Sequence, residues 1–326
     1  KHMAILGAYH ASNTVIGEGT NSVVFYGERL VDRLPVAIKL TDPTVAVERE
    51  ISILQLLARS YPTSKAFPRL LEVVDLPNKR CLVFEYIAGT TLLALLEAHP
   101  HGLSEEYVSI IVGRVASALS LVHELGIAHR DIKLENIMVT DAGRVVLLDF
   151  GLAHVCERGA LTRVCSGSLH YVPAEVVKGL AHDPFVSDLY SLGVTLYALL
   201  CNRFPFAPAP IATSTSASAT TSSGLPSKLL SGAAPLPRAS LNKLATESLF
   251  AAILRGYVAL PTSLSLEAST LVLALLRSNP ADRPTLNEVL LHPFVSGIRS
   301  SWCSAACRGR VLPPMVPSDF ETSRTM

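Results

Sequence analysis

The sequence predicts an α+β protein with a bilobal fold: a small antiparallel β-sheet lobe with one main helix, followed by a larger, mainly helical lobe. Two patterns support this prediction. Apolar and polar residues alternate between glycines near the start of the 326 residues, and apolar residues recur at helical spacing through the rest. Strands followed by helices are typical of folds that segregate the two. A chain of this length can also bury a sizeable core.

The sheet-rich lobe comes from the first quarter of the chain. Residues 8–40 alternate apolar and polar side chains between glycines, which predicts short strands. Residues 44–59 carry apolar side chains at helical spacing and predict a helix. Residues 67–74 and 80–86 predict two further strands.

From residue 92 onward the apolar spacing is helical. The predicted elements are, in order, amphipathic helices at 92–98 and 105–125, a short hairpin at 137–139 and 145–148, and buried helices at 187–200 and 270–276. Two segments do not fit a packed lobe. Residues 207–241 are mostly Ala, Ser, Thr and Pro, and this composition buries too little apolar surface to offset its ordering entropy, so we expect a flexible insert. Residues 299–326 predict an irregular tail.

Composition and charge exclude several classes of protein. The 28 basic and 27 acidic residues give a net charge of +1, so we expect no nucleic-acid partner. Hydrophobic residues make up 49% of the chain, which excludes global disorder. The longest charge-free stretch, 204–227, is not rich in Leu, Ile or Val, so we expect no membrane span. Six cysteines without a CxxC pair predict free thiols in a reducing compartment, and hence a cytoplasmic or nuclear location.

A glycine-rich segment, residues 17–24, lies between two strand-like stretches. Glycines let the backbone approach phosphates closely, and exposed amides there can bind phosphate oxygens. Taken alone, the segment is equally compatible with an ordinary hairpin turn. A second signal is Lys39 at the end of an apolar strand, followed by Glu50 in the predicted helix. A lysine paired with a helical carboxylate can present a fixed positive charge to an anion, although the two could also be unrelated surface charges.

The segment 129–136 holds six polar side chains directly after an apolar helix end. A buried loop this polar is costly unless its groups are paired or functional. Asp149 follows at the end of another apolar run, beside a glycine, and Asn136 can supply a second oxygen ligand. Hard oxygen donors in small number favour Mg²⁺ that is shared with phosphates. Asp131 is then left to orient a hydroxyl group.

Together these motifs resemble eukaryotic-type serine/threonine protein kinases, most closely the calcium/calmodulin-dependent and AMP-activated group. The resemblance covers residues 10–298, with a small lobe at about 10–87 and a large lobe at about 88–298. It implies a protein-kinase-like fold and a Ser/Thr kinase activity. The matching segments are, in family order, 17–24, VAIK at 36–39, EREISIL at 48–54, VFEYIAG at 83–89, HRDIKLEN at 129–136, DFG at 149–151, SLHYVPAE at 168–175, SDLYSLGVTLYALL at 187–200, NPADRPT at 279–285 and HPFV at 292–295.

The resemblance implies ATP and Mg²⁺ as the nucleotide and metal, and protein Ser/Thr side chains as acceptors. By similarity, Lys39 paired with Glu50 would hold the α- and β-phosphates, Asp131 would accept or orient the hydroxyl proton, Lys133 would steady the transferred phosphoryl group, and Asn136 and Asp149 would bind the metal. The implied nucleotide-binding residues are Ile16, Gly17, Glu18, Gly19, Thr20, Asn21, Ser22, Val23, Val24, Ala37, Lys39, Glu85, Ile87 and Met138, with Glu85 and Ile87 acting through their backbones.

The sequence departs from the family pattern in its small lobe. Ser22 replaces the third glycine of the loop, and Lys39 and Glu50 are closer in sequence than is usual. The short spacing requires either that the helix begins at Pro43 or that the pair forms imperfectly.

Two departures fall in the large lobe. The family's Ala-Pro-Glu segment is reordered here, but Glu175 remains available to pair with Arg283. The position of an activating phosphothreonine in relatives is Val164, with Thr162 and Ser166 two residues away on either side.

The sequence is also compatible with two alternatives. One is a catalytically inactive kinase-fold scaffold that binds nucleotide or partner proteins, and the other is a small-molecule phosphotransferase of related fold. The tail contains Trp302 among arginines, but Gly309 and several serines disfavour a helix, so we expect it not to bind calmodulin. The sequence leaves the oligomeric state open.

Overall fold

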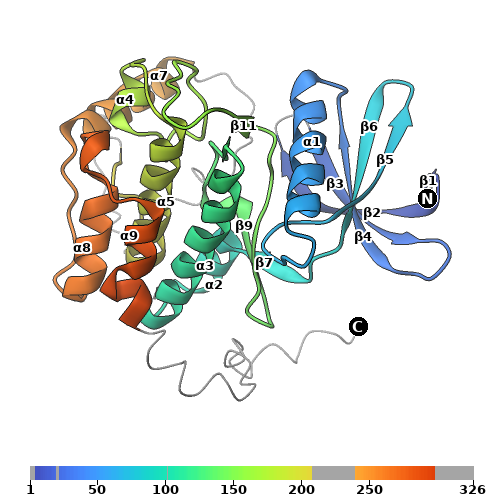
Figure 1. Cartoon of the computed structure of the whole chain (residues 1–326), viewed down its shortest axis with the longest axis horizontal. Coiled ribbons are helices and arrows are strands. Elements are labelled where there is room, and N and C mark those ends of the chain that lie inside the picture. Colours follow the sequence, from blue (N-terminus) through green and yellow to red (C-terminus); the bar gives the residue numbers. More distant parts are fainter. Residues whose placement is uncertain (1–3, 20–21, 101, 208–238, 298–326) are drawn as a thin grey trace, which may run out of the picture.

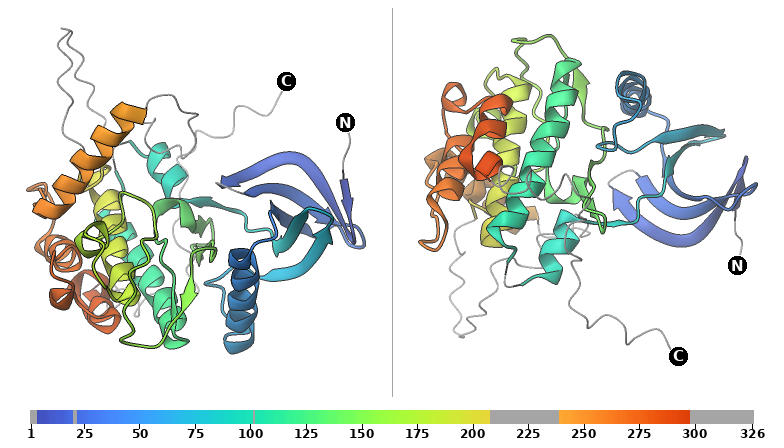
Figure 2. Two further views of the ribbon diagram at one scale, coloured as in Figure 1. Left: turned by 90° about the horizontal axis from the view of Figure 1, so that it is seen from above. Right: turned by 60° about the horizontal axis from the view of Figure 1, so that its bottom comes forward.

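The computed structural model describes residues 4–19, 22–100, 102–207 and 239–297. The loop residues Thr20 and Asn21, most of the expected insert and the whole of the expected tail lie outside these ranges. The described residues form two lobes, a sheet-rich one from the N-terminal part and a helical one from the rest (Figure 1). This arrangement confirms the predicted fold class. The two views of Figure 2 show the same separation, with the chain between β6 and α2 joining the lobes.

The small lobe is built on a six-stranded antiparallel sheet with the strand order β1-β2-β3-β4-β6-β5. Its strands are β1 (Ala4–Leu6), β2 (Tyr9–Gly19), β3 (Ser22–Arg29), β4 (Pro35–Thr41), β5 (Leu70–Leu76) and β6 (Lys79–Glu85). In the central strands Lys39 lies opposite Val24 of β3 on one side and Leu82 of β6 on the other. This register places Lys39 in the interior of the sheet, on a strand that pairs with a neighbour on each side.

One helix, α1 (Val45–Ser60), accompanies this sheet. The Thr44 side chain caps its N-terminus by accepting a hydrogen bond from the Val47 amide. Val47, Ile51 and Leu54 are buried on the same face as Glu50. The helix therefore presents Glu50 to the interior of the protein.

The large lobe contains seven α-helices among the described residues, two 3₁₀ turns and five short strands. The helices are α2 (Leu92–Ala98), α3 (Glu105–Glu124), α4 (Ala174–Val177), α5 (Pro184–Cys201), α7 (Ala239–Arg255), α8 (Leu266–Leu275) and α9 (Leu286–Leu291), and the 3₁₀ turns are Leu134–Asn136 and Pro280–Asp282. The strands β7 (Gly89–Thr91), β9 (Ile137–Thr140) and β10 (Val145–Leu147) form one small sheet, and β8 (Ile127–Ala128) pairs with β11 (His154–Val155). The predicted hairpin is β9 and β10.

Several helices and strands were not predicted from the sequence. The short strands and helices β1, β7, β8, β11, α4 and α9 were not predicted, because segments of two to six residues carry little periodicity. Helix α7 was also missed, and it begins at Ala239, inside the last three residues of the expected insert. Its later turns bury Leu249 and Ile253 in the core of the large lobe, which is tertiary packing that composition alone does not reveal.

Two core helices meet the length and hydropathy criteria of a membrane span. The mean hydropathy is 1.2 for α3 and 1.3 for α5. Neither helix was predicted as a membrane span, because both contain charged residues. Of the 18-residue apolar stretch in each helix, 56% is buried inside the protein in α3 and 67% in α5, because both helices pack into the large-lobe core.

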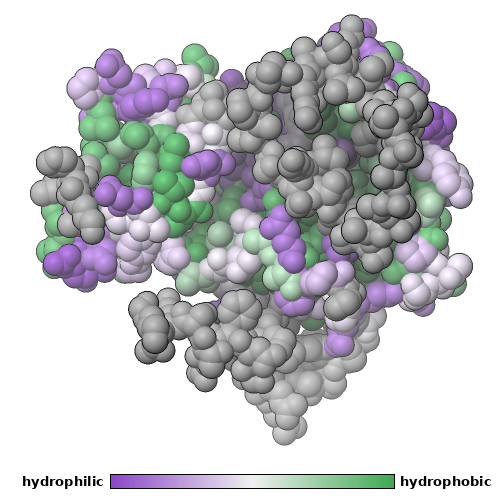
Figure 3. Space-filling view, turned by 180° about the vertical axis from the view of Figure 1, so that it is seen from behind, coloured by the Kyte–Doolittle hydropathy of each residue, from purple (hydrophilic) through white to green (hydrophobic). Residues whose placement is uncertain are grey.

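Apolar side chains are also exposed in both lobes. Val31 on the small lobe and Tyr257 on the large lobe have exposed fractions of 85% and 79%. Seen from behind, described hydrophobic residues are interspersed with hydrophilic ones (Figure 3). Scattered exposed apolar residues are normal for folded proteins, so they do not by themselves mark an interface.

Candidate active site

A cavity of about 330 Å³ lies between the two lobes. Eleven residues of the predicted nucleotide set line it: Ile16, Gly17, Glu18, Gly19, Ser22, Val24, Ala37, Lys39, Glu85, Ile87 and Met138. Val23 does not line it, because successive side chains of a strand point to opposite faces and Ser22 and Val24 take the cavity face. The remaining two predicted residues, Thr20 and Asn21, lie outside the described ranges.

The glycine-rich segment forms the roof of this cavity as the β2–β3 hairpin, where Gly19 lies opposite Ser22. A Cβ atom at position 19 would lie 2.9 Å from the Ser22 hydroxyl oxygen, which is closer than such contacts normally are. Glycine at position 19 therefore accommodates the serine that replaces the third glycine of the family pattern.

Lys39 and Glu50 form a direct ion pair despite their short spacing. The Lys39 Nζ atom lies 2.7 Å from Glu50 Oε1 and 2.9 Å from Oε2, and the exposed fractions of the two side chains are 14% and 3%. Helix α1 begins at Val45, not at Pro43, and only residues 42–44 connect it to β4. Neither sequence-based alternative therefore holds, because the pair forms fully with a helix that starts two residues later.

Lys39 also reaches across the cavity to Asp149, with Nζ 3.1 Å from Oδ1. Burial by itself would lower the pKa of Lys39, but the negative charges of Asp149 and Glu50 raise it above its usual value. Burial disfavours the charged form of Asp149 as well and would raise its pKa, yet the nearby Lys39 charge holds that pKa below its usual value. Both groups are thus charged at neutral pH, and a positive charge is fixed at the cavity wall.

The backbone around Asp149 is shaped to turn its side chain into the cavity. Asp149 adopts a left-handed conformation with φ of 53°, and its Oδ1 accepts a hydrogen bond from the Gly151 amide at 3.3 Å. The next residue, Phe150, is fully buried and packs edge-on against His129, with ring centroids 4.9 Å apart. Phe150 anchors the turn and leaves the Asp149 carboxylate at the cavity surface.

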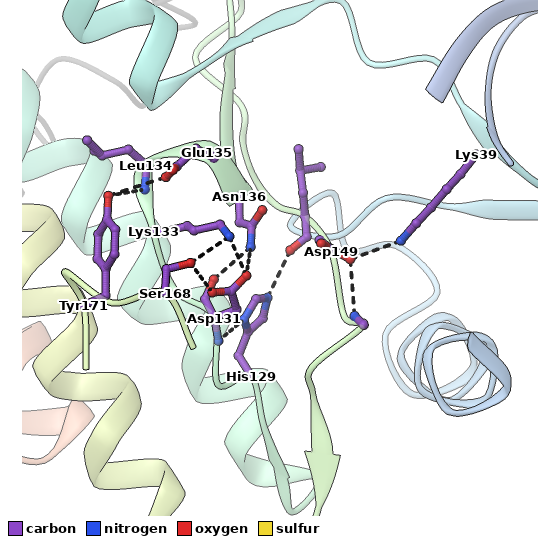
Figure 4. Close-up of polar contacts among 12 residues, drawn as sticks. Lys39, His129, Asp131, Lys133, Leu134, Glu135, Asn136, Asp149, Ser168 and Tyr171 are labelled. Carbon is purple, nitrogen blue, oxygen red and sulfur yellow. Dashed lines mark hydrogen bonds and ion pairs between the residues drawn. The ribbon is translucent and has the colours of Figure 1, made fainter. Parts of the chain in front are cut away.

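Asp131 lies at the large-lobe side of the site, with both carboxylate oxygens held (Figure 4). Its Oδ2 lies 2.7 Å from Lys133 Nζ and accepts a hydrogen bond from Asn136 Nδ2 at 2.9 Å. Its Oδ1 accepts a hydrogen bond from the Ser168 hydroxyl at 3.0 Å, and Lys133 also donates to Ser168 at 3.0 Å. The carboxylate is therefore fixed in orientation and kept close to a cation.

Asn136 joins the two halves of the site. Its Nδ2 atom donates to the backbone oxygen and to the carboxylate of Asp131, which leaves its carbonyl oxygen as the ligand atom, and its side chain lies between Asp131 and Asp149 (Figure 4). Asn136 and Asp149 both line the cavity. Mg²⁺ accepts one or two protein oxygens and completes its shell with water and phosphate oxygens, so this donor set fits it. The described residues contain no cluster of three or more His, Cys, Asp or Glu side chains that could hold a metal alone.

The backbone of the loop that carries Asp131 is held by Asp188, which was not predicted from the sequence as a functional residue. This buried carboxylate of α5 accepts hydrogen bonds from the amides of His129 and Arg130 at 2.8 and 2.7 Å, and His123 Nε2 lies 2.9 Å from it. Arg130 is thereby kept in a left-handed conformation with φ of 66°. A lone carboxylate in an otherwise apolar helix was the available signal, since such a group is buried only when it has partners.

His129 is the neutral tautomer with the proton on Nε2. This nitrogen lies 3.0 Å from the Leu148 carbonyl oxygen, and Nδ1 accepts a hydrogen bond from the Asp131 amide at 3.3 Å. Complete burial lowers the pKa of His129 below its usual value. The ring therefore connects the strand that leads to Asp149 with the loop that carries Asp131.

The remaining sequence-based interpretations fall around the segment 162–175. Arg283 and Glu175 form a buried bidentate pair, with Nη1–Oε1 and Nη2–Oε2 distances of 2.6 and 2.9 Å. The Ser166 hydroxyl accepts a hydrogen bond from Arg130 Nε at 2.7 Å, whereas Thr162 pairs through its backbone with His182 and Val164 is 58% exposed. Of the three positions considered, Ser166 is thus the one that contacts Arg130.

Comparison with known protein families matches residues 10–295 to the protein kinase domain. Among curated proteins, the chain is 31% identical over 207 residues to maternal embryonic leucine zipper kinase of Xenopus tropicalis, a match that covers 61% of this chain and 31% of that protein. It is 33% identical over 218 residues to CBL-interacting protein kinase 16 of Oryza sativa subsp. japonica, covering 62% and 45%. It is also 27% identical over 302 residues to SNF1-related protein kinase catalytic subunit alpha KIN12 of Arabidopsis thaliana, covering 90% and 52%. The chain spans between about a third and a half of the length of these relatives.

Proposed function

The chain belongs to the protein kinase family, and on that premise we propose that it transfers the γ-phosphate of ATP to Ser and Thr hydroxyls of protein substrates, with Mg²⁺ as the metal. The observation that carries the proposal is the continuity of the site. Lys39, Asp149 and Asn136 line one cavity, and Asn136 is hydrogen-bonded to Asp131.

The side chains divide the chemistry between them. Lys39, held by Glu50 and Asp149, presents a fixed positive charge to the α- and β-phosphates. Asn136 and Asp149 would hold the metal, which neutralises phosphate charge when bound. Asp131, fixed by Lys133, Asn136 and Ser168, is placed to orient the acceptor hydroxyl and receive its proton. Positioning and fixed charge supply most of the acceleration in phosphoryl transfer.

Serine or threonine acceptors are proposed because Lys133, two residues after Asp131, and Ser168 resemble the residues of serine/threonine kinases at these positions. The two side chains contact each other beside Asp131. The proteins of known function that this chain resembles include one named a serine/threonine-protein kinase, the SIK3 homolog of Danio rerio, at 30% identity over 211 residues. Glu135, which resembles a residue that selects basic substrates, lies 3.5 Å from the Tyr171 hydroxyl, and burial raises its pKa. We therefore propose no preference for basic substrates.

The test is a peptide-array phosphorylation assay with ATP and Mg²⁺, using the full chain and its Asp131→Asn variant. We expect wild-type transfer to Ser and Thr peptides and a loss of about 10²–10⁴-fold in the variant, the contribution of a positioned base. Asp141→Asn, which changes an exposed carboxylate of the β9–β10 turn, is the matched control and should transfer at the wild-type rate. An ATP-dependent rise in melting temperature without transfer by the wild type would instead favour the inactive scaffold.

A further inference from the structure

Arg144 makes a set of contacts that none of the predicted catalytic roles explains. It lies at the end of the turn between β9 and β10, in the large lobe. Its Nη2 atom lies 2.6 Å from Glu85 Oε1, and its Nε atom donates to the Lys65 carbonyl oxygen at 2.6 Å. Nη2 is also 3.4 Å from the Phe67 carbonyl oxygen. One guanidinium of the large lobe therefore binds two separate segments of the small lobe.

The first segment is the hinge, residues 85–89, through which the chain passes from β6 to β7. Glu85 lines the cavity, and its backbone amide already donates to the Arg69 carbonyl oxygen at 3.0 Å. The carbonyl oxygen of Glu85 is thus its backbone group left for an adenine edge. Because Arg144 holds the side chain of the same residue, it fixes the position of that carbonyl oxygen relative to the large lobe.

The second segment is the α1–β5 loop, residues 61–69, which directly follows the helix that carries Glu50. Besides the two contacts of Arg144, this loop accepts a hydrogen bond from the Leu147 amide of β10 to the Ala66 carbonyl oxygen at 2.9 Å. Strand β10 ends at Leu147, two residues before Asp149. Arg144 and β10 therefore connect the loop after the C-terminus of α1, the helix that carries Glu50, to the strand that leads to Asp149.

The chemistry of the contacts requires arginine. The exposed fractions of the Arg144 and Glu85 side chains are 24% and 25%, so water competes only partly for the pair. A guanidinium presents several donors in a rigid planar fork, whereas a lysine ammonium is a compact point charge on a flexible chain. Three acceptors contributed by two chain segments can be held together by the fork and not equally by a lysine.

We infer that Arg144 is a positioning residue for the nucleotide: by binding Glu85, Lys65 and Phe67 together, it sets the hinge and the α1–β5 loop against the Asp149 strand. The inference rests on the proposed function. It acts on binding geometry and not on the acceptor hydroxyl, so its loss weakens ATP binding more than it slows the transfer step. Misplacement by about 1 Å can cost about 10²-fold, and with other contacts still in place we expect a smaller effect.

The experiment compares Arg144→Gln, Arg144→Lys and Glu85→Gln in the full chain. The matched control is Arg29→Gln, which breaks an arginine–carboxylate pair with Asp32 on the small-lobe surface. The readouts are the ATP KM, kcat, the rise in melting temperature caused by ATP with Mg²⁺, and the melting temperature without nucleotide. All kinetics are measured at least 15 °C below the melting temperature of each variant, so that unfolding does not enter the ATP KM.

We expect Arg144→Gln to raise the ATP KM about tenfold and to reduce the nucleotide-induced melting shift, with kcat changed less than about threefold. Arg144→Lys and Glu85→Gln should give intermediate increases, and Arg29→Gln none. An unchanged ATP KM in Arg144→Gln, even with a lower melting temperature, would overturn the inference, as would a fall in kcat alone. Failure of the proposed function is distinguishable, because the wild type would then show no transfer at all.

Discussion

The buried pair between Arg283 and Glu175 gives a quantitative test of what holds the large lobe together. Arg283→Met removes a side chain that is fully buried and bonded to both oxygens of Glu175. It also removes the donor to the Arg277 carbonyl oxygen, 2.9 Å from Nε, and the cation above the Tyr190 ring, 4.9 Å from its centroid. The substitution leaves the Glu175 carboxylate buried without a partner cation.

The expected cost follows from that orphaned charge. Breaking a buried ion pair by removing one partner costs about 3–5 kcal/mol. The lost hydrogen bond to Arg277 adds about 1 kcal/mol. At about 2–4 °C per kcal/mol for a domain of some 200 residues, the total cost of about 4–6 kcal/mol lowers the melting temperature by about 8–24 °C.

The assay is urea and thermal unfolding of the wild type, Arg283→Met and the double variant Glu175→Leu/Arg283→Met. The double variant removes both charges and should recover at least half of the loss, because apolar replacements of buried ion pairs are often close to neutral. A loss below about 1 kcal/mol in Arg283→Met would refute the reasoning, since the carboxylate would then have found another partner or reached water. A double variant as unstable as the single one would show that charge burial is not the cause.

Three further predictions concern the site. Glu50→Gln leaves Lys39 paired only with Asp149, so we expect kcat/KM for phosphoryl transfer to fall about tenfold or more. Glu48→Gln, on the exposed face of the same helix, should not change kcat/KM. Steady-state kinetics measures both, and equal rates for the two variants would contradict the role of the pair. His129 has a pKa below its usual value of about 6.5, so below that pH the unfolded chain binds a proton that the folded chain does not. The stability present above pH 6.5 is therefore lost as pH falls, by at most about 1.4 kcal/mol per pH unit from this group. Urea midpoints between pH 5 and 7.5 for wild type and His129→Phe measure this pH dependence, and parallel curves would count against the contribution of His129. Asp188→Asn weakens the hydrogen bonds from the amides of His129 and Arg130, so we expect a loss of about 2–4 kcal/mol in stability and a fall in kcat. Urea unfolding and steady-state kinetics measure the two effects. Wild-type values for both would exclude a role of Asp188 in holding the loop that carries Asp131.

Local signals were sufficient for most long elements. The helix at 44–59 and the strand at 80–86 were predicted within one residue of their observed ends, because apolar spacing over seven or more residues is a strong signal. Helix α7 was not predicted, because it begins inside the Ala- and Ser-rich segment 207–241 and its buried residues, Leu249 and Ile253, pack in a core that is assembled from distant parts of the chain. Short strands such as β7 exist only through pairing with β9, which is a contact between distant residues.

The candidate site divides in the same way. Asp131, Asn136, Asp149 and Lys39 stood out because polar residues next to apolar runs have few structural explanations. Asp188 and Arg144 did not stand out, because each acts on groups 58 to 79 positions away in the chain. Their roles depend on which backbone groups the fold brings within hydrogen-bond distance.

The sequence by itself determined the two-lobed fold class, the protein kinase family and the identity of the polar groups at the site, because motif order and hydrophobic periodicity are properties of residues near one another in the chain. Only the tertiary structure decided that Lys39 and Glu50 pair despite a linker of three residues, that Val23 faces away from the cavity, and that Arg144 binds the hinge. The physical reason is that hydrogen bonds and ion pairs require their atoms to lie within about 3–4 Å, and spacing along the chain does not fix that distance.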